Sequence, residues 1–181
     1  MSKETITTDL MELFRQYGYD GVSLTKISEA TGLGKSSLYH HFPEGKEQMA
    51  KEVLTFIAGA VKQYFVCPLQ TSEKPRVKLQ NMVKVVEDFY DSGKKGCLVD
   101  GLTLGEANPL FQSTIAEIVE AWIDAIAEVG VESGLSKKIA RERAENIMIA
   151  IQGSLVVSRA LGYFTPFKRV VRDIPSMMLD Q

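Results

Sequence analysis

Five polar residues in one short stretch of the chain could bind a nucleic acid. They offer an ammonium group, two small hydroxyls, a phenol and an imidazole, and they are Lys35, Ser36, Ser37, Tyr39 and His40. Leu38 and Phe42 are four residues apart, so in a helix they share one face and leave most of the polar side chains on the other. Small hydroxyls permit close approach, and the larger groups can hydrogen-bond base edges and phosphates. The pattern is typical of a helix that reads nucleic acid.

Two short helices joined by a tight turn would have to position this surface. Ser23 is a suitable N-cap for a helix at 24–31, Gly32 can adopt the positive φ of a turn, and a second helix follows at about 35–41. A helix at 3–17 precedes them and also has one apolar face. The residues predicted to pack these helices together are Ile27, Ala30, Leu33, Leu38 and Phe42. The segment 23–42 therefore has the length and punctuation of a helix-turn-helix, with a generic helical hairpin as the alternative.

The stretch Leu38-Tyr-His-His-Phe-Pro-Glu-Gly-Lys-Glu47, preceded by Thr25-Lys-Ile-Ser-Glu-Ala-Thr-Gly-Leu33, resembles the DNA-binding domain of TetR-family transcriptional repressors. The resemblance covers about residues 5–55, and the Leu-Tyr-x-His-Phe core is joined to Lys-Glu at the start of the next helix, as in that family. It implies an all-α chain whose N-terminal part binds double-stranded operator DNA.

The resemblance also implies roles for single residues. Base edges in the major groove would be contacted by Lys35, Ser36 and Ser37. Tyr39 and His40 match positions that hold phosphate or base, and Thr25 matches a phosphate contact. Lys46 opens the next helix, where its charge and the first amides could both address one phosphate. Lys26 is a weaker candidate, and His41 is expected to be structural.

The remaining residues are predicted to form longer helices, with no convincing strand pattern. The expected helices span about 46–65, 75–91, 97–105, 108–131 and 137–162, and a last one starts at 165 and is distorted or ended near Pro175. We predict an all-α fold with an N-terminal helix-turn-helix DNA-binding domain at 1–50. A helical effector-binding and dimerisation domain at 51–181 would share the long helix that begins at Lys46.

The segment from Ile147 to Gly162 is apolar around its whole circumference, which is typical of a buried helix. Close approach of a second helix would be allowed by Ala150, Gly153, Ser154 and Ala160. Burial against a second subunit would cover this surface, and in TetR-family proteins the last two long helices pair across a two-fold axis. We therefore expect a homodimer through these helices, with a central core helix in a monomer as the alternative.

A set of large residues lies on the helices that, by resemblance, enclose the family's small-molecule pocket. The set comprises Phe89, Phe111, Ile115, Trp122, Met148, Gln152 and Leu155. Apolar side chains with few polar anchors suit a small hydrophobic effector, although aromatic residues at helical spacing also build ordinary cores. Gly96-Cys97-Leu98 loosely resembles a TetR subgroup of flavonoid- and drug-responsive repressors. Cys97 follows Lys94 and Lys95, which favour a thiolate, but an inert half-buried cysteine is the simpler interpretation.

Composition excludes several other classes of protein. The 181 residues are 45% hydrophobic and 24% charged, and no apolar run reaches the roughly 18–20 residues of a membrane span. The first residues lack the apolar core of a signal peptide, and two cysteines give no disulfide framework, so we expect a cytoplasmic protein. Adjacent His40 and His41 diverge by about 100° on a helix and cannot chelate one metal. We expect neither a metal nor a cofactor.

Charge and motifs limit the function further. The net charge is −2, and residues 1–61 hold six Lys/Arg against eight Asp/Glu, so DNA contact must come from local placement of charge. No phosphate loop, paired metal-binding histidines or nucleophile elbow is present, and we predict no enzymatic activity. The predicted function is a repressor that binds a pseudo-palindromic operator as a dimer and leaves it when an effector binds. A protein-binding adaptor built on a helix-turn-helix scaffold is the alternative.

Overall fold

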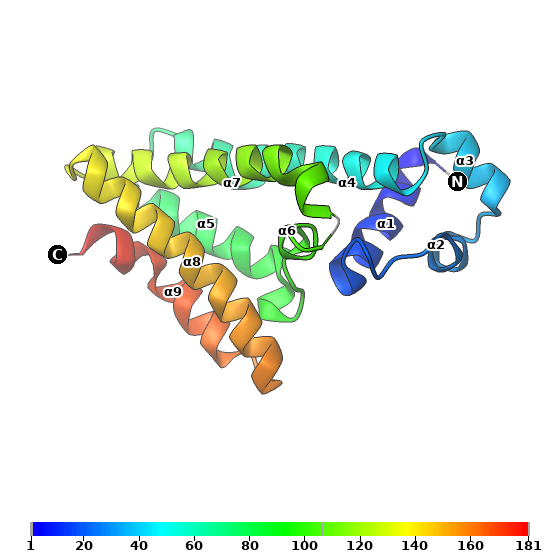
Figure 1. Cartoon of the computed structure of the whole chain (residues 1–181). Helices are drawn as coiled ribbons and strands as arrows, with labels where there is room; N and C mark the ends of the chain where they lie inside the picture. Colours follow the sequence, from blue (N-terminus) through cyan, green and yellow to red (C-terminus); the bar gives the residue numbers. More distant parts are fainter. Residues whose placement is uncertain (1, 106, 181) are drawn as a thin grey trace. The chain divides into compact units, whose positions relative to one another are not determined.

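The computed structural model describes residues 2–105 and 107–180, and helices connected by short turns make up this part of the chain (Figure 1). The N-terminal helices are α1 (Lys3–Tyr17), α2 (Leu24–Thr31), α3 (Lys35–His41) and α4 (Lys46–Val61), which continues as a π-helical turn (Lys62–Val66). They are followed by α5 (Pro75–Phe89), α6 (Leu98–Gly101), α7 (Ala107–Glu132), α8 (Lys137–Leu161) and α9 (Thr165–Leu179). The all-α prediction is confirmed.

Local sequence signals set the two short helices as expected. The hydroxyl of Ser23 accepts the Lys26 amide at 3.2 Å and caps α2, and Gly32 ends this helix with φ +67°. Ile27, Leu38 and Phe42 are completely buried. The prediction that Ala30 packs inward is wrong, because Ala30 is exposed. Thr31, one full turn after Ile27, takes the inward place instead.

The chain divides into two compact units that differ from the predicted domains. The first contains the residues up to Gly59 together with Cys97–Ala116, and the second contains Ala60–Gly96 together with the residues from Glu117. Helices α4 and α7 each contribute to both units, so composition shifts along the chain could not mark this division. The assignment of DNA binding to residues 1–50, and of effector binding and dimerisation to residues 51–181, remains a proposal.

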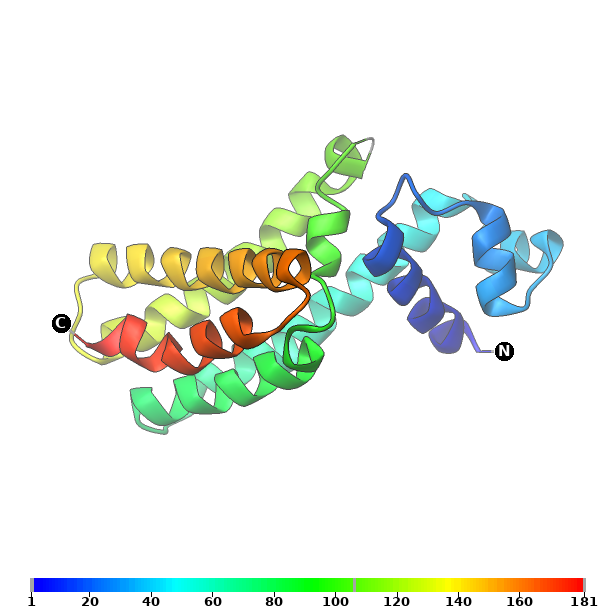
Figure 2. The same cartoon turned by 90° about the horizontal axis from the view of Figure 1, so that it is seen from below.

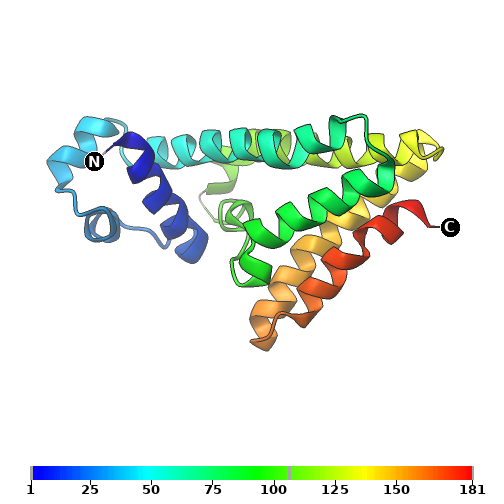
Figure 3. The same ribbon diagram turned by 180° about the vertical axis from the view of Figure 1, so that it is seen from behind.

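In the second unit, α9 packs against both α8 and α5 (Figures 2 and 3). Ile174, Pro175 and Met178 are buried on its inner side. The prediction that α9 is distorted or ends near Pro175 is wrong as to its end, because the helix continues to Leu179. A proline removes one backbone hydrogen bond, and burial of its neighbours offsets that loss.

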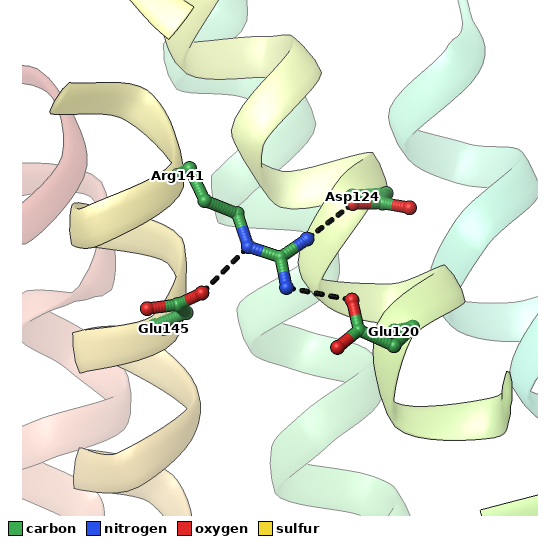
Figure 4. A network of polar contacts seen from close by, with 4 residues as sticks. All are labelled: Glu120, Asp124, Arg141 and Glu145. Atoms are coloured by element: carbon green, nitrogen blue, oxygen red, sulfur yellow. Dashed lines mark hydrogen bonds and ion pairs between the residues drawn. The ribbon is translucent and has the colours of Figure 1, made fainter. Parts of the chain in front are cut away.

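Polar contacts fix α8 against α7 in the same unit. The Arg141 guanidinium lies among three carboxylates (Figure 4), pairing with Glu120 at 2.6 Å and Asp124 at 2.5 Å on α7 and with Glu145 at 2.7 Å on α8. Hydrogen bonds to Glu145 and Glu120 raise the pKa of Arg141 further above its ordinary value. With one side held by α7 and another by α9, α8 has a defined outward face.

Candidate nucleic-acid interface

Helix α3 presents the polar face that the sequence predicts. Leu38 is completely buried, whereas Lys35, Ser36, Ser37, Tyr39 and His40 are exposed. Tyr39 is 46% exposed although it carries a large aromatic ring. The two buried anchors Leu38 and Phe42 therefore hold α3 with its donors directed away from the core. The roles of single residues toward bases or phosphates stay predictions.

Charge around α3 favours an anion despite the acidic composition of the chain. The helix reads Lys-Ser-Ser-Leu-Tyr-His-His and contains no carboxylate. Its first amides lack partners within the helix and carry the positive end of the helix dipole. Two carboxylates on α4 are paired with lysines, Glu52 with Lys3 at 2.5 Å and Glu47 with Lys51 at 2.7 Å. The hydrogen bond to Glu47 raises the pKa of Lys51 above its ordinary value.

The start of α4 adds a second group of donors beside Tyr39. Gly45 has φ +72° and precedes the first residue of α4. A Cβ atom at Gly45 would lie 3.6 Å from the Tyr39 ring, so the ring packs directly on this turn. The first amides of a 16-residue helix and the Tyr39 hydroxyl are therefore near one another. Such an arrangement suits one phosphate oxygen.

The eight residues that the sequence predicts to bind DNA are not equally available for that contact in the structure. Thr25 is exposed, but the Lys46 ammonium donates to the Tyr19 carbonyl at 3.1 Å and lies 4.1 Å from the centre of the Tyr19 ring. Lys26 donates to the Gly21 carbonyl at 2.8 Å and lies 4.0 Å from the Tyr17 ring centre. The sequence does not predict that Tyr19 and Tyr17 contact these two lysines, because no local pattern indicates either pairing.

A second surface of interest lies on the outward side of α8. We call it the α8 apolar face; its members are Ile149, Gly153, Val156, Val157 and Ala160, all exposed. Ile149 is 67% exposed, and a side chain at Gly153 would meet nothing within 4 Å. The prediction that Ser154 belongs to this contact surface is wrong. Its side chain is buried inside the unit and donates to the Ile151 carbonyl at 2.8 Å.

The seven predicted effector residues are divided between the two units. Phe89 and Trp122 pack on Phe65, with ring centres 5.2 and 4.6 Å away, and the Gln152 amide donates to the Tyr90 hydroxyl at 3.4 Å. Met148 and Leu155 are buried in the same unit. Phe111 and Ile115 belong to the first unit.

Two hollows of the second unit are lined by residues outside the predicted effector set. One, of about 560 Å³, lies along α5 and α9, and the other, of about 470 Å³, lies between α7 and α8. Whether an effector binds at the predicted residues stays a prediction.

We expect Lys35→Ala to lower discrimination between specific and unrelated DNA. If the ammonium contacts a base edge, its loss should cost about 1–3 kcal/mol for the specific sequence and little for unrelated DNA. Tyr39→Phe, which removes a phosphate donor, should weaken binding to both DNAs similarly. Fluorescence anisotropy with both duplexes measures this difference, and an unchanged affinity ratio for Lys35→Ala would show that Lys35 does not read bases.

Neither a membrane-spanning helix nor a metal-binding cluster is found in the part of the chain that the structure describes. No helix in residues 2–105 and 107–180 is both long and apolar enough to cross a membrane. Within the same residues, no group of three or more His, Cys, Asp or Glu side chains could hold a metal ion. Cys67 is exposed and Cys97 is half-buried.

Comparison with known families gives two matches on this chain. Residues 6–53 match the family model described as bacterial regulatory proteins of the tetR family. Residues 75–173 match the C-terminal domain model described as transcriptional regulator LmrA/YxaF-like. The second match alone covers more than half of the chain.

Curated relatives and solved structures agree with these matches. The chain is 27% identical to the HTH-type transcriptional regulator YxaF of Bacillus subtilis, covering 98% of this chain and 95% of the relative. It is 25% identical to LmrA of the same organism, covering 98% and 96%. The crystal structure of a TetR transcriptional regulator from Legionella pneumophila has a TM-score of 0.84 at 22% identity, covering 98% and 97%, and supports the fold.

Proposed function

Because this chain belongs to the TetR family of helix-turn-helix transcriptional regulators, we propose that it is a repressor released from its operator by a small hydrophobic effector. DNA binding and transcriptional regulation are the function of the family. The observation that carries the proposal is the exposed face of α3, with donors from Lys35 to His40, no carboxylate, and two buried anchors. The protein acts without enzymatic activity, in the cytoplasm.

A homodimer is the binding species in this proposal. Val156 and Val157 are 49% and 46% exposed, and together with Ile149 they leave a continuous apolar surface along α8. Val170 and Met177 are half-buried on α9, which packs against α8. Contiguous apolar surface of this kind marks a protein contact. Two α3 helices related by a two-fold axis would read the two halves of a pseudo-palindromic operator.

The second unit is the proposed effector-binding part. Phe65, Phe89 and Trp122 form an aromatic cluster, and Gln152 with Tyr90 supplies polar groups beside it. The Trp122 indole N–H is directed at the sulfur of Met82, 3.4 Å away, which is a weak acceptor. A hydrophobic compound with an acceptor could replace this contact. Such a compound releases DNA only if it binds the DNA-free arrangement more tightly.

Selection from a pool of random DNA duplexes tests the DNA-binding part of the proposal. We expect the full-length protein to enrich an inverted repeat whose half-site centres lie about one helical turn, roughly 34–36 Å, or a multiple of it apart. A matched selection with a Ser36→Glu, Ser37→Glu double variant, whose charges would repel phosphates, serves as the control. If that variant enriched the same repeat, α3 would be excluded as part of the DNA interface. The absence of any enriched sequence with wild-type protein would favour the adaptor alternative.

We expect an effector and the operator to weaken each other's binding by the same factor. A coupling free energy of about 1–3 kcal/mol corresponds to a 5–150-fold change in affinity, and linkage makes the change reciprocal. A thermal-shift screen of small hydrophobic compounds identifies the effector, and calorimetric titration with and without the selected duplex measures the coupling. Equal effector affinity in the two titrations would mean that the protein is not released by this compound.

A further inference from the structure

Tyr19 connects three parts of the first unit that lie far apart in the sequence. It follows α1 and is almost completely buried. Its backbone amide donates to the Gly101 carbonyl on α6 at 3.3 Å, and its ring meets the Phe111 ring edge-on with centres 5.3 Å apart. Its carbonyl and ring both hold the Lys46 ammonium, at 3.1 and 4.1 Å. Tyr19 therefore links Cys97–Ala116 to the first residue of α4.

Holding Lys46 also holds the DNA-reading helix. Only Phe42, Pro43, Glu44 and Gly45 separate the end of α3 from Lys46. The Gly45 amide donates to the Phe42 carbonyl at 2.9 Å, and the Tyr39 ring packs on Gly45. A shift of the first turn of α4 would therefore displace Tyr39 and the C-terminal end of α3.

The chain continues from the segment Cys97–Ala116 into the second unit in both directions. Cys97 directly follows Gly96, which belongs to the second unit, and α7 passes from the first unit to the second after Ala116. Gly101 is packed closely against α1, since a Cβ atom there would lie 3.1 Å from the Phe14 carbonyl oxygen. Because little space is left beside Gly101, a movement of Cys97–Ala116 toward α1 would displace α1.

We propose that Lys46 is a positioning residue that couples the segment Cys97–Ala116 to the DNA-reading helix through Tyr19, and that it is not a phosphate contact. The proposal rests on the function proposed above and specifies its route of regulation. The sequence alone favours a phosphate contact, because a lysine at a helix start suits an anion. A cation held by both a carbonyl and a ring of its own chain is instead suited to fix the start of α4 before DNA binds.

Salt dependence of DNA binding distinguishes a positioning lysine from a phosphate contact. A phosphate contact contributes about 0.9 to the slope of log affinity against log salt concentration for each lysine. Lys46→Met should lower affinity for the selected duplex about tenfold, through loss of the cation–π and hydrogen-bond contacts, and leave this slope unchanged. Lys46→Arg, which can still stack on Tyr19, should retain most of the affinity. A slope reduced by about 0.9 per lysine removed would overturn the proposal.

Lys74→Met provides the matched control. Lys74 carries the same charge and is exposed just before α5 in the second unit, where no DNA contact is proposed. Its replacement should change neither affinity nor slope by an amount comparable to Lys46→Met. Circular dichroism melting of each variant identifies those that fold like wild type, and only these enter the comparison. If Lys46→Met does not fold, Lys46→Gln, which keeps a hydrogen-bond donor, takes its place.

A double-mutant cycle tests the coupling itself. Gly101→Ala places a Cβ atom against α1 and should lower DNA affinity, whereas Gly59→Ala, where a Cβ atom meets nothing within 4 Å, should not. If both residues act through Tyr19, Gly101→Ala should weaken binding much less when Lys46 is already Met. If the loss of DNA affinity in the double variant equals the product of the losses in the two single variants, the proposal is overturned. Failure of wild-type protein to bind any duplex selectively would instead overturn the proposed function.

Discussion

Val157→Glu should convert the protein to a monomer and lower its affinity for the selected operator by about 10²–10⁴. The side chain is 46% exposed at the centre of the α8 apolar face, so a carboxylate there does not disturb the core of the unit. In the proposed dimer, two like charges would be buried against each other without partners, which costs several kcal/mol. Each monomer would then bind one half-site and lose the 10²–10⁴ advantage of a linked second site. Sedimentation velocity and anisotropy measure the two effects.

Val77→Glu is the matched control for this variant. Val77 is 37% exposed, carries the same side chain and lies on α5, outside the α8 apolar face. We expect it to leave both the sedimentation coefficient and the operator affinity unchanged. A Val157→Glu protein that still sediments as the wild type and binds the operator equally well would exclude α8 as the dimer interface.

Phe111→Ala should lower the free energy of unfolding of the first unit by about 3–5 kcal/mol. Phe111 is 1% exposed, and its ring lies against Tyr19 in the interior of this unit. Removing a buried phenylalanine ring costs its transfer free energy and leaves a cavity that the surrounding residues fill only partly. Denaturant unfolding followed by circular dichroism measures the loss. Leu110→Ala, at a neighbouring position that is 43% exposed, should cost much less.

This variant also separates two interpretations of Phe111. The sequence places it among the effector-lining residues, whereas the structure assigns it to the first unit. A Phe111→Ala protein with unchanged stability and weakened effector binding would favour the sequence interpretation. Strong destabilisation would make Phe111 part of the core that supports α1 and α6.

Sequence patterns predicted the parts of the site that depend on nearby residues. Ser23 and Gly32 act within a few residues of themselves, so their capping and turn roles follow from residue type. Leu38 is buried and its polar neighbours are exposed because helical spacing alone separates the two faces of α3. Ile149 and Val157 are exposed on a helix whose sequence has more apolar residues than one buried face requires. The family match over residues 6–53 then confirmed the DNA-binding regulator that the sequence predicts.

Contacts between distant residues limited the remaining predictions. Lys46 lies 27 residues from Tyr19, and no pattern at either position indicates that a carbonyl and a ring hold this ammonium. Ser154 is small enough for a helix contact, but its burial inside the unit follows from the packing of α8 in the fold. Phe111 belongs to the first unit because Cys97–Ala116 folds with α1, which hydrophobic periodicity cannot show.

The ratio of affinities for the selected duplex and a shuffled duplex of equal composition tests the central claim most directly. The claim is that this protein reads DNA sequence through α3. Anisotropy titrations at one stated salt concentration should give a ratio of about 10³ or more, the range of specific regulators. The Lys35→Ala protein should show a smaller ratio under the same conditions. Equal affinity of the wild-type protein for the two duplexes would contradict the account.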